Sequence, residues 1–221
     1  MSFLIIVGLL VISYFVGSIP FGLLVVRIFN GKDIRNIESG RIGGTNAMRA
    51  AGAGAGILTG LLDGIKGAST VWLARAVIPG NHWIEIFAAL MAIMGHNFSV
   101  FLLEKRDGNP LKFRGGAGGA TLVGGVFAFW PPSLMIILPI GFLIWYGIGY
   151  ASLTTISAGI LAMIIFVVKS LQNSTPWEYV VYSFLAELIV LWALRPNLAR
   201  LRNGTERLQG WRAKIQVRGE D

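Results

Sequence analysis

The sequence contains no cysteine and only two histidines, His82 and His96. Without cysteine it can form neither a disulfide framework nor a thiolate metal or redox centre. Two histidines are too few for a histidine-based metal site, and no HEXXH or DXD spacing accompanies them. The sequence also lacks a GxSxG nucleophile elbow. We therefore expect no metal, no cofactor and no serine-hydrolase chemistry.

Charged residues are scarce as well. They make up 14% of the 221 residues, whereas hydrophobic residues make up 54%, and the mean hydropathy is +0.66. These values exclude an ordinary water-soluble globular domain. A membrane-spanning helix needs about 20 mostly apolar residues, and several runs of that kind occur along the chain. We predict a single all-α, polytopic membrane domain over residues 1–221, surrounded by membrane lipid.

The net charge of +8 could suggest a nucleic-acid partner. The basic residues, however, lie in short segments between apolar runs, as the excess of Lys and Arg in cytoplasmic loops would produce. We therefore expect no nucleic-acid partner. The sequence carries no signal of oligomeric state.

The spacing of the apolar runs predicts about seven transmembrane helices. The first run is too long for a signal peptide and has no basic residue before it. Its basic flank follows at Arg27, Lys32 and Arg35, which predicts an outer N-terminus and a cytoplasmic C-terminus. The cytoplasmic segments would be loops 27–49 and 104–116 and the tail 195–221. The expected spans lie near residues 2–26, 50–77, 83–103, 116–130, 132–150, 152–168 and 177–194.

A polar, glycine-broken segment over residues 31–52 separates the first two apolar runs. It contains Arg35, Arg41 and Arg49 together with Ser39 and several glycines. Backbone N–H groups in a glycine-rich turn, combined with arginines, bind anions. Segments 104–121 and 195–207, also glycine- or cation-rich, should lie on the same side of the membrane. The pattern predicts a phosphorylated ligand that is approached from the cytoplasm.

Three polar residues lie within predicted membrane helices: Asp63, Lys66 and His96. Polar groups at membrane depth are costly, which makes them functional candidates. The alternative is that Asp63 and Lys66 form an internal ion pair that holds the bundle. Glycines 52, 56, 60 and 64 repeat every four residues and are typical of close helix packing. We assign no role to Glu187, which stands alone in the last apolar run.

The sequence resembles the bacterial acyl-phosphate:glycerol-3-phosphate acyltransferases (PlsY) over nearly its whole length. The motifs that carry the resemblance occur in the family's order: GSIPFG at 17–22, GKDIR at 31–35, ESGRIGGTN at 38–46 with Arg49, DGIKG at 63–67, GHNFSVF at 95–101, GGAGGAT at 115–121 and the segment 194–206.

The resemblance implies a seven-helix, multi-pass enzyme of the cell membrane, with its active site facing the cytoplasm. Its substrates would be acyl phosphate and glycerol 3-phosphate, and its products lysophosphatidate and phosphate. Ser39 and Arg49 would hold phosphate, and Asn197 would complete the catalytic group. The further positions that match the family and would bind substrate are Gly43, Thr45, Asn46, Lys66, His96, Gly118 and Thr121.

The chain departs from the family pattern at several of these motifs. The family's lysine in GGKG is Ala117 here, and the histidine of HRxN is Leu194. The asparagine of GSGN is Arg41, and the first glycine of that motif is Glu38. We expect Arg41 and Arg114 to bind substrate in place of the missing side chains, since a guanidinium supplies the same charge with a fork of donors.

Two other functions are compatible with the sequence. The losses at 117 and 194 favour a non-catalytic or repurposed relative that binds a phosphorylated ligand or lipid. Glycine-broken helices also occur in small transporters, although the sequence shows no inverted repeat.

Overall fold

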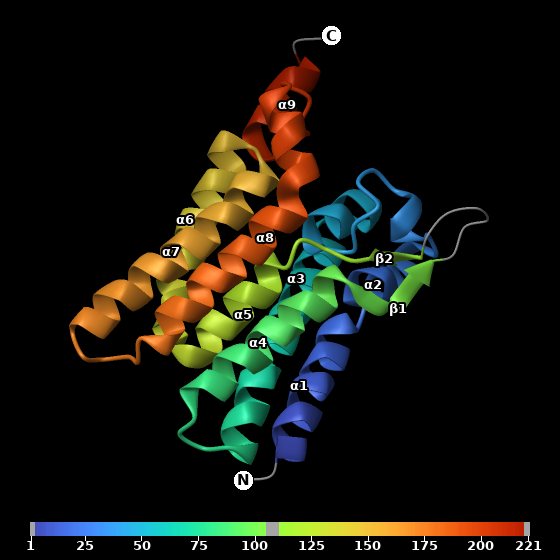
Figure 1. Cartoon of the computed structure of the whole chain (residues 1–221). Helices are drawn as coiled ribbons and strands as arrows, with labels where there is room; N and C mark the ends of the chain where they lie inside the picture. The colour runs from blue at the N-terminus through green and yellow to red at the C-terminus, as the bar shows by residue number, and fades with distance from the viewer. Residues whose placement is uncertain (1–2, 105–110, 219–221) are drawn as a thin grey trace.

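The computed structural model describes residues 3–104 and 111–218. Residues 105–110 of the expected loop and 219–221 of the tail lie outside the described residues. The helices pack side by side in one tilted bundle, with the two ends of the described chain at opposite ends of it (Figure 1). The α-helices are α1 Phe3–Ser18, α2 Phe21–Asn30, α3 Gly44–Val77, α4 His82–Asn97, α5 Gly119–Phe129, α6 Leu134–Leu143, α7 Ala151–Leu171, α8 Glu178–Arg202 and α9 Gly210–Arg218.

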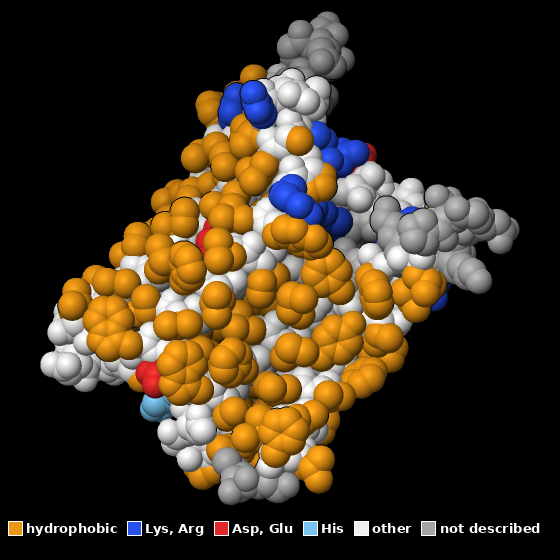
Figure 2. Space-filling model, viewed as in Figure 1, with side chains coloured by type: hydrophobic (Ala, Val, Ile, Leu, Met, Phe, Trp, Pro, Cys, Tyr) orange, Lys and Arg blue, Asp and Glu red, His pale blue; other side chains and the backbone are white. Residues whose placement is uncertain are grey.

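The outer surface of the bundle is strongly apolar (Figure 2). Met135 is 82% exposed and Phe3 75% exposed, which an aqueous surface would penalise. Among the described residues, four helical segments are long and apolar enough to cross a membrane: Phe3–Asn30, Pro131–Ile148, Ala151–Leu171 and Glu178–Arg202. The predicted helical membrane class is therefore confirmed.

Proline interrupts the helices at two places, whereas Pro139 and Pro196 lie inside α6 and α8. The first predicted span is two helices, α1 and α2, separated at Ile19 and Pro20. Pro131 and Pro132 form a short 3-10 turn, η2 (Pro131–Ser133), between α5 and α6. A proline lacks an N–H and its ring clashes with the preceding helical turn, so the helices end there. The division of residues 116–150 into two helical segments agrees with the prediction.

The prediction of an all-α chain was wrong in one place. Strand β1 (Ser99–Glu104) pairs antiparallel with β2 (Lys112–Arg114), so α4 ends at Asn97 and not at Leu103. The Ser99 hydroxyl donates to the carbonyl of Ser18 at the end of α1, 2.6 Å away. Backbone pairing with β2, which begins eight residues after β1 ends, decides this conformation, and the apolar periodicity of the sequence does not indicate it.

Helix α3 lies at the centre of the bundle and begins earlier than predicted, at Gly44. It is kinked at Ala51 and Gly52, where Gly52 takes a φ of +88° that favours glycine. Farther along, its backbone approaches α5 closely. A Cβ at Gly67 would collide with the carbonyl of Thr121, and a Cβ at Gly124 would collide with the carbonyl of Gly64. Glycine thus permits the two backbones to touch, as in small-xxx-small helix pairs.

Candidate active site

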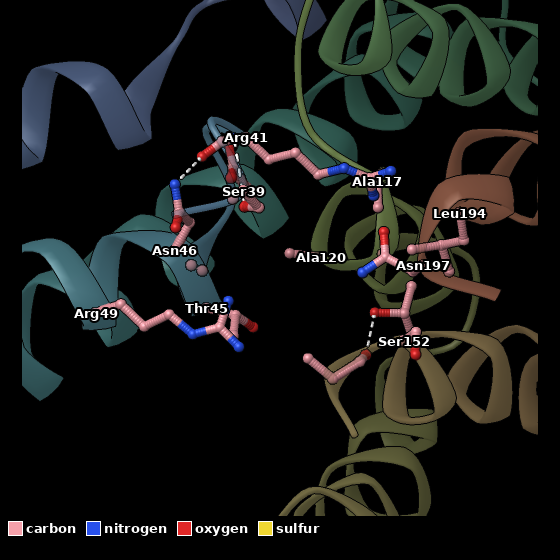
Figure 3. Close-up of a pocket in the computed structure, with 18 of the residues that line it drawn as sticks. Ser39, Arg41, Thr45, Asn46, Arg49, Ala117, Ala120, Ser152, Leu194 and Asn197 are labelled. Atoms are coloured by element: carbon pink, nitrogen blue, oxygen red, sulfur yellow. Dashed lines mark hydrogen bonds between the residues drawn. The ribbon is translucent and has the colours of Figure 1, made fainter. Parts of the chain in front are cut away.

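A polar pocket of about 220 Å³ opens at the end of the bundle where several helix ends meet (Figure 3). Three helices begin at its wall: α3 with Gly43–Thr45, α5 with Gly118–Ala120, and α7 with Ala151 and Ser152. The first N–H groups of a helix have no partner within the helix, and the macrodipole places a partial positive charge there. Three such ends at one cavity produce a site suited to anions.

The glycine-rich loop before α3 forms one wall of the pocket and is held by Asn46. The buried Asn46 amide donates to the carbonyls of Ile34, Ile37 and Arg41 at 3.3, 3.0 and 2.8 Å. A Cβ at Gly22 of α2 would collide with the carbonyl of Ile42, so the loop lies directly on α2. The loop is therefore a fixed structure that presents its remaining polar groups to the cavity.

Arg41, Arg49 and Arg207 also line the pocket. Within the described chain, no acceptor lies within hydrogen-bond distance of the Arg49 guanidinium, so its donors are available to a ligand. Burial lowers the pKa of Arg41 below its ordinary value, and the nearby Arg200 adds to this effect. A buried guanidinium with little opposite charge around it is stabilised when an anion binds next to it.

The second wall consists of residues 117–120, and the two glycines before them pack against the end of α4. The N–H of Gly116 donates to the carbonyl of His96 at 3.0 Å, and the N–H of Ile42 donates to the carbonyl of Gly115 at 3.4 Å. These bonds tie the two glycine-rich segments together. Gly118 caps α5 with a φ of +86°, a conformation that glycine adopts without strain.

The end of α8 and the following loop form the third wall. The Asn197 amide donates to Glu206 at 2.7 Å, and Arg200 Nε donates to the same carboxylate at 3.0 Å. Arg207 pairs with Glu38 of the glycine-rich loop. Polar side chains from the two ends of the sequence therefore meet at this pocket.

Comparisons with known proteins agree with this architecture. The family described as Glycerol-3-phosphate acyltransferase matches residues 7–204. A glycerol-3-phosphate acyltransferase of Thermus thermophilus is 38% identical over 207 residues, covering 94% of this chain and 96% of that protein. This chain belongs to the glycerol-3-phosphate acyltransferase family. The family named from the sequence motifs is thereby confirmed.

Two further comparisons agree with the family. A relative from Rubrobacter xylanophilus is also 38% identical, over 93% of this chain and 96% of its own. Among solved structures, the glycerol 3-phosphate form of PlsY (YgiH), an integral membrane glycerol 3-phosphate acyltransferase, superimposes with a TM-score of 0.79 at 29% identity. That match covers 96% of this chain and 98% of PlsY.

Most residues predicted for the site line the pocket, but three do not. Lys66 and Thr121 are buried behind it, and Arg114 lies to one side, donating to Glu104 at 2.8 Å and to the carbonyl of Arg35 at 3.3 Å. The predicted residues that the structure brings together are Ser39, Arg41, Gly43, Thr45, Asn46, Arg49, His96, Gly118 and Asn197.

The pocket also includes polar residues that were not predicted for it. Asp63 had been identified only as a membrane-depth charge, whereas Ser152, Thr155, Glu206 and Arg207 had received no role. Glu206 belongs to the segment 194–206, whose family counterpart could have indicated it, and Arg207 lies in the cation-rich segment 195–207. Ser152 and Thr155 carried no signal, because a Ser/Thr-rich helix start is common in membrane helices.

Asp63, Lys66 and His96 form a buried cluster beneath the pocket. Lys66 Nζ lies 2.8 Å from Asp63 Oδ1, 2.8 Å from His96 Nδ1, and 3.0 Å from the carbonyl of Ile19, to which it donates. Asp63 and His96 reach the pocket wall, whereas Lys66 does not. Lys66 therefore neutralises Asp63 and joins α3 to the break between α1 and α2.

Ala117 and Leu194, where the family pattern has lysine and histidine, face the same cavity as Arg41. The Arg41 side chain extends across the pocket toward Ala117 (Figure 3) and donates to the carbonyl of Ala193 in α8. A small side chain at 117 leaves room for this guanidinium. The guanidinium of Arg41 therefore places a positive charge beside Ala117.

An apolar groove of about 570 Å³ continues from the pocket between α3, α5, α6 and α7. Gly60, Gly119, Ala120 and Thr155 line both cavities, so the two are contiguous. We call the second cavity the apolar groove. A cationic pocket that opens into an apolar groove fits a molecule with an anionic head and a hydrocarbon chain.

Proposed function

We propose that this protein transfers a fatty acyl group from acyl phosphate to the 1-hydroxyl of glycerol 3-phosphate. The products are lysophosphatidate and phosphate, and the reaction belongs to phospholipid biosynthesis. The observation that carries the proposal is the junction of a pocket lined by three helix N-termini and three arginines with an apolar groove. Family membership supports the same acceptor.

The protein acts as a single membrane domain with about seven spans, an outer N-terminus and a cytoplasmic pocket. Basic side chains gather at the end of the bundle that carries α9, whereas the opposite end shows few of them (Figure 2). The pocket lies at this basic end. An excess of Lys and Arg is typical of the cytoplasmic side, so both substrates enter from the cytoplasm.

The two phosphates bind to different walls of the pocket. Arg49 and Ser39, with the first amides of α3, hold the phosphate of glycerol 3-phosphate. The first amides of α5, after Gly118, hold the phosphoryl group of the donor. Asn197 lies opposite, where its amide orients the reacting groups, and the acyl chain enters the apolar groove.

The reaction needs little covalent help from the protein, because acyl phosphate is an activated mixed anhydride. The oxygen of the 1-hydroxyl attacks the acyl carbonyl carbon, and the bond from that carbon to the phosphate oxygen breaks. The hydroxyl proton passes to an oxygen of the departing phosphate. Positioning and stabilisation of the developing negative charge supply the catalysis, and Arg41 and the helix N-termini provide the charge.

Arg41, and not Arg114, replaces the cation that the family carries at position 117. Arg41 lines the pocket beside Ala117, whereas Arg114 is held by Glu104 within the two-stranded sheet. We therefore retain Arg41 as a substrate-binding residue and assign Arg114 to support of the glycine-rich loop.

The test is phosphate release by the purified protein with acyl phosphate and glycerol 3-phosphate, together with detection of lysophosphatidate. Release should require both substrates. Binding of either substrate without release would favour a non-catalytic relative, and uptake of labelled glycerol 3-phosphate into proteoliposomes without lipid product would favour a transporter. An Ala117→Lys, Leu194→His double variant, measured in parallel, shows whether turnover depends on the missing side chains. Turnover by that variant alone would overturn the proposal.

A further inference from the structure

Aromatic side chains line the far end of the apolar groove. Trp72 of α3 and Phe127 of α5 both line it, with ring centroids 6.2 Å apart and rings inclined by 72°. One turn beyond Trp72, Arg75 Nη1 donates to the carbonyl of Ala128 at 2.6 Å and so ties α3 to α5. The groove therefore ends at this aromatic pair.

The charges beyond the pair make that end unsuitable for hydrocarbon. Arg75 Nε lies 3.0 Å from Glu85 Oε2, and Tyr179 donates to the same oxygen at 2.9 Å. Disrupting this partly buried network to admit a methylene group would leave charged groups unpaired. An acyl chain that fills the groove contacts the two aromatic rings at its far end, and the polar network lies behind these rings.

The length of the groove can be read from the helices that form it. On α3 the groove is lined from Ile57 to Trp72, and the part from Gly60, where it joins the polar pocket, to Trp72 is about 18 Å at the helical rise of about 1.5 Å per residue. On α5 it runs from Gly119 to Phe127, or about 12 Å by the same rise. An extended alkyl chain advances roughly 1.25 Å per carbon, by the usual carbon–carbon bond length and angle, so the groove takes roughly 10 to 14 carbons.

We propose that Trp72 and Phe127 set the acyl-chain length that this protein accepts. The inference rests on the proposed acyltransferase function and adds the residues that determine its donor specificity. The aromatic pair lies at the opposite end of the groove from the reacting groups, so it acts on the end of the chain and not on the chemistry.

Two variants with opposite effects test the proposal. Trp72→Ala with Phe127→Ala opens the end of the groove, and Val123→Phe narrows it one turn before Phe127. Rates are measured with decanoyl, dodecanoyl, tetradecanoyl, hexadecanoyl and octadecanoyl phosphate. Because a single methylene in an apolar site changes discrimination roughly tenfold or more, we expect the octadecanoyl-to-dodecanoyl rate ratio to rise by at least about tenfold in the opened variant and to fall in the narrowed one.

The matched control is Trp83→Ala with Phe87→Ala. These rings form another aromatic pair, stacked at 6.1 Å on α4, and neither lines the groove. The control should keep the wild-type length profile. An unchanged profile in both groove variants, with turnover intact, would overturn the inference.

A binding measurement separates this inference from the proposed reaction. Non-hydrolysable acyl phosphonates of the same lengths are titrated against each protein. If no donor turns over but the preferred phosphonate length shifts in the groove variants, the proposed reaction is wrong, whereas the role of Trp72 and Phe127 in setting chain length is supported. If the chain-length dependence of neither the rates nor the affinities changes when Trp72 and Phe127 are replaced, these residues do not set the accepted chain length.

Discussion

Arg207 Nε lies 2.6 Å from Glu38 Oε2, and this ion pair joins the loop after α8 to the glycine-rich loop across the pocket. Arg207 lines the pocket, whereas Glu38 holds a φ of +49°, which is unusual for a residue other than glycine. The chain thus has a glutamate with a left-handed backbone conformation where the family pattern has glycine, and its carboxylate pairs with one of the cations that line the pocket.

We expect Glu38→Gly to lower the KM for glycerol 3-phosphate, because Arg207 is then available to phosphate. The two side chains are 39% and 46% exposed, and pairs of this kind contribute about 0.2–1 kcal/mol, so the change should be at most about fivefold. Arg207→Gln should raise the KM. Glu178→Gln, which removes a carboxylate at the start of α8, serves as the charge-matched control. An unchanged KM in Glu38→Gly would show that the pair does not compete with substrate.

Arg41→Ala should reduce kcat/KM far more than Arg114→Ala. A lost hydrogen bond to a charged group costs about 1.5–3 kcal/mol, which corresponds to about 10- to 150-fold. Arg114 contacts Glu104 and the carbonyl of Arg35, and its loss should act mainly on stability. Initial rates and thermal unfolding of both variants distinguish the two roles. Equal losses of activity at equal stability would contradict the assignment.

Asn46→Asp should destabilise the protein more than its near-identical shape suggests. The Asn46 amide donates to three carbonyls of the loop, and a carboxylate cannot donate to any of them. Buried acceptors that lose their donor cost about 1–3 kcal/mol. Thermal unfolding in detergent measures the loss, with Asn36→Asp in the exposed part of the same loop as control. A melting temperature equal to that of the control would contradict this role.

Lys66→Met should destabilise the protein strongly, because it leaves Asp63 without its cation. Removing one member of a buried pair costs about 3–5 kcal/mol, whereas replacing both is often nearly neutral. We therefore expect Asp63→Asn with Lys66→Met to recover much of the lost stability. Since Asp63 lines the pocket and Lys66 does not, activity need not recover with it. A double variant no more stable than Lys66→Met would contradict the pairing.

Much of the architecture could be predicted from the sequence, because the apolar runs and glycine-rich segments are local features. The helical membrane class was predicted in this way, and nine of the twelve residues predicted for the site, several of them from the family resemblance, line the pocket. Strand β1 could not be, since Ser99–Glu104 is as apolar as the helix before it and becomes a strand only by pairing with β2.

The sequence by itself determined which residues were available: the arginines, the glycine-broken loops and the departures at Ala117 and Leu194. Only the tertiary structure decided which arginine lies beside them in the pocket. Arg41 and Arg114 have the same charge and both flank glycine-rich segments. Arg41 extends into the pocket beside Ala117, whereas Glu104 holds Arg114 away from it. The reach of a side chain and the position of its partner depend on contacts between distant segments, and residue type alone does not specify them.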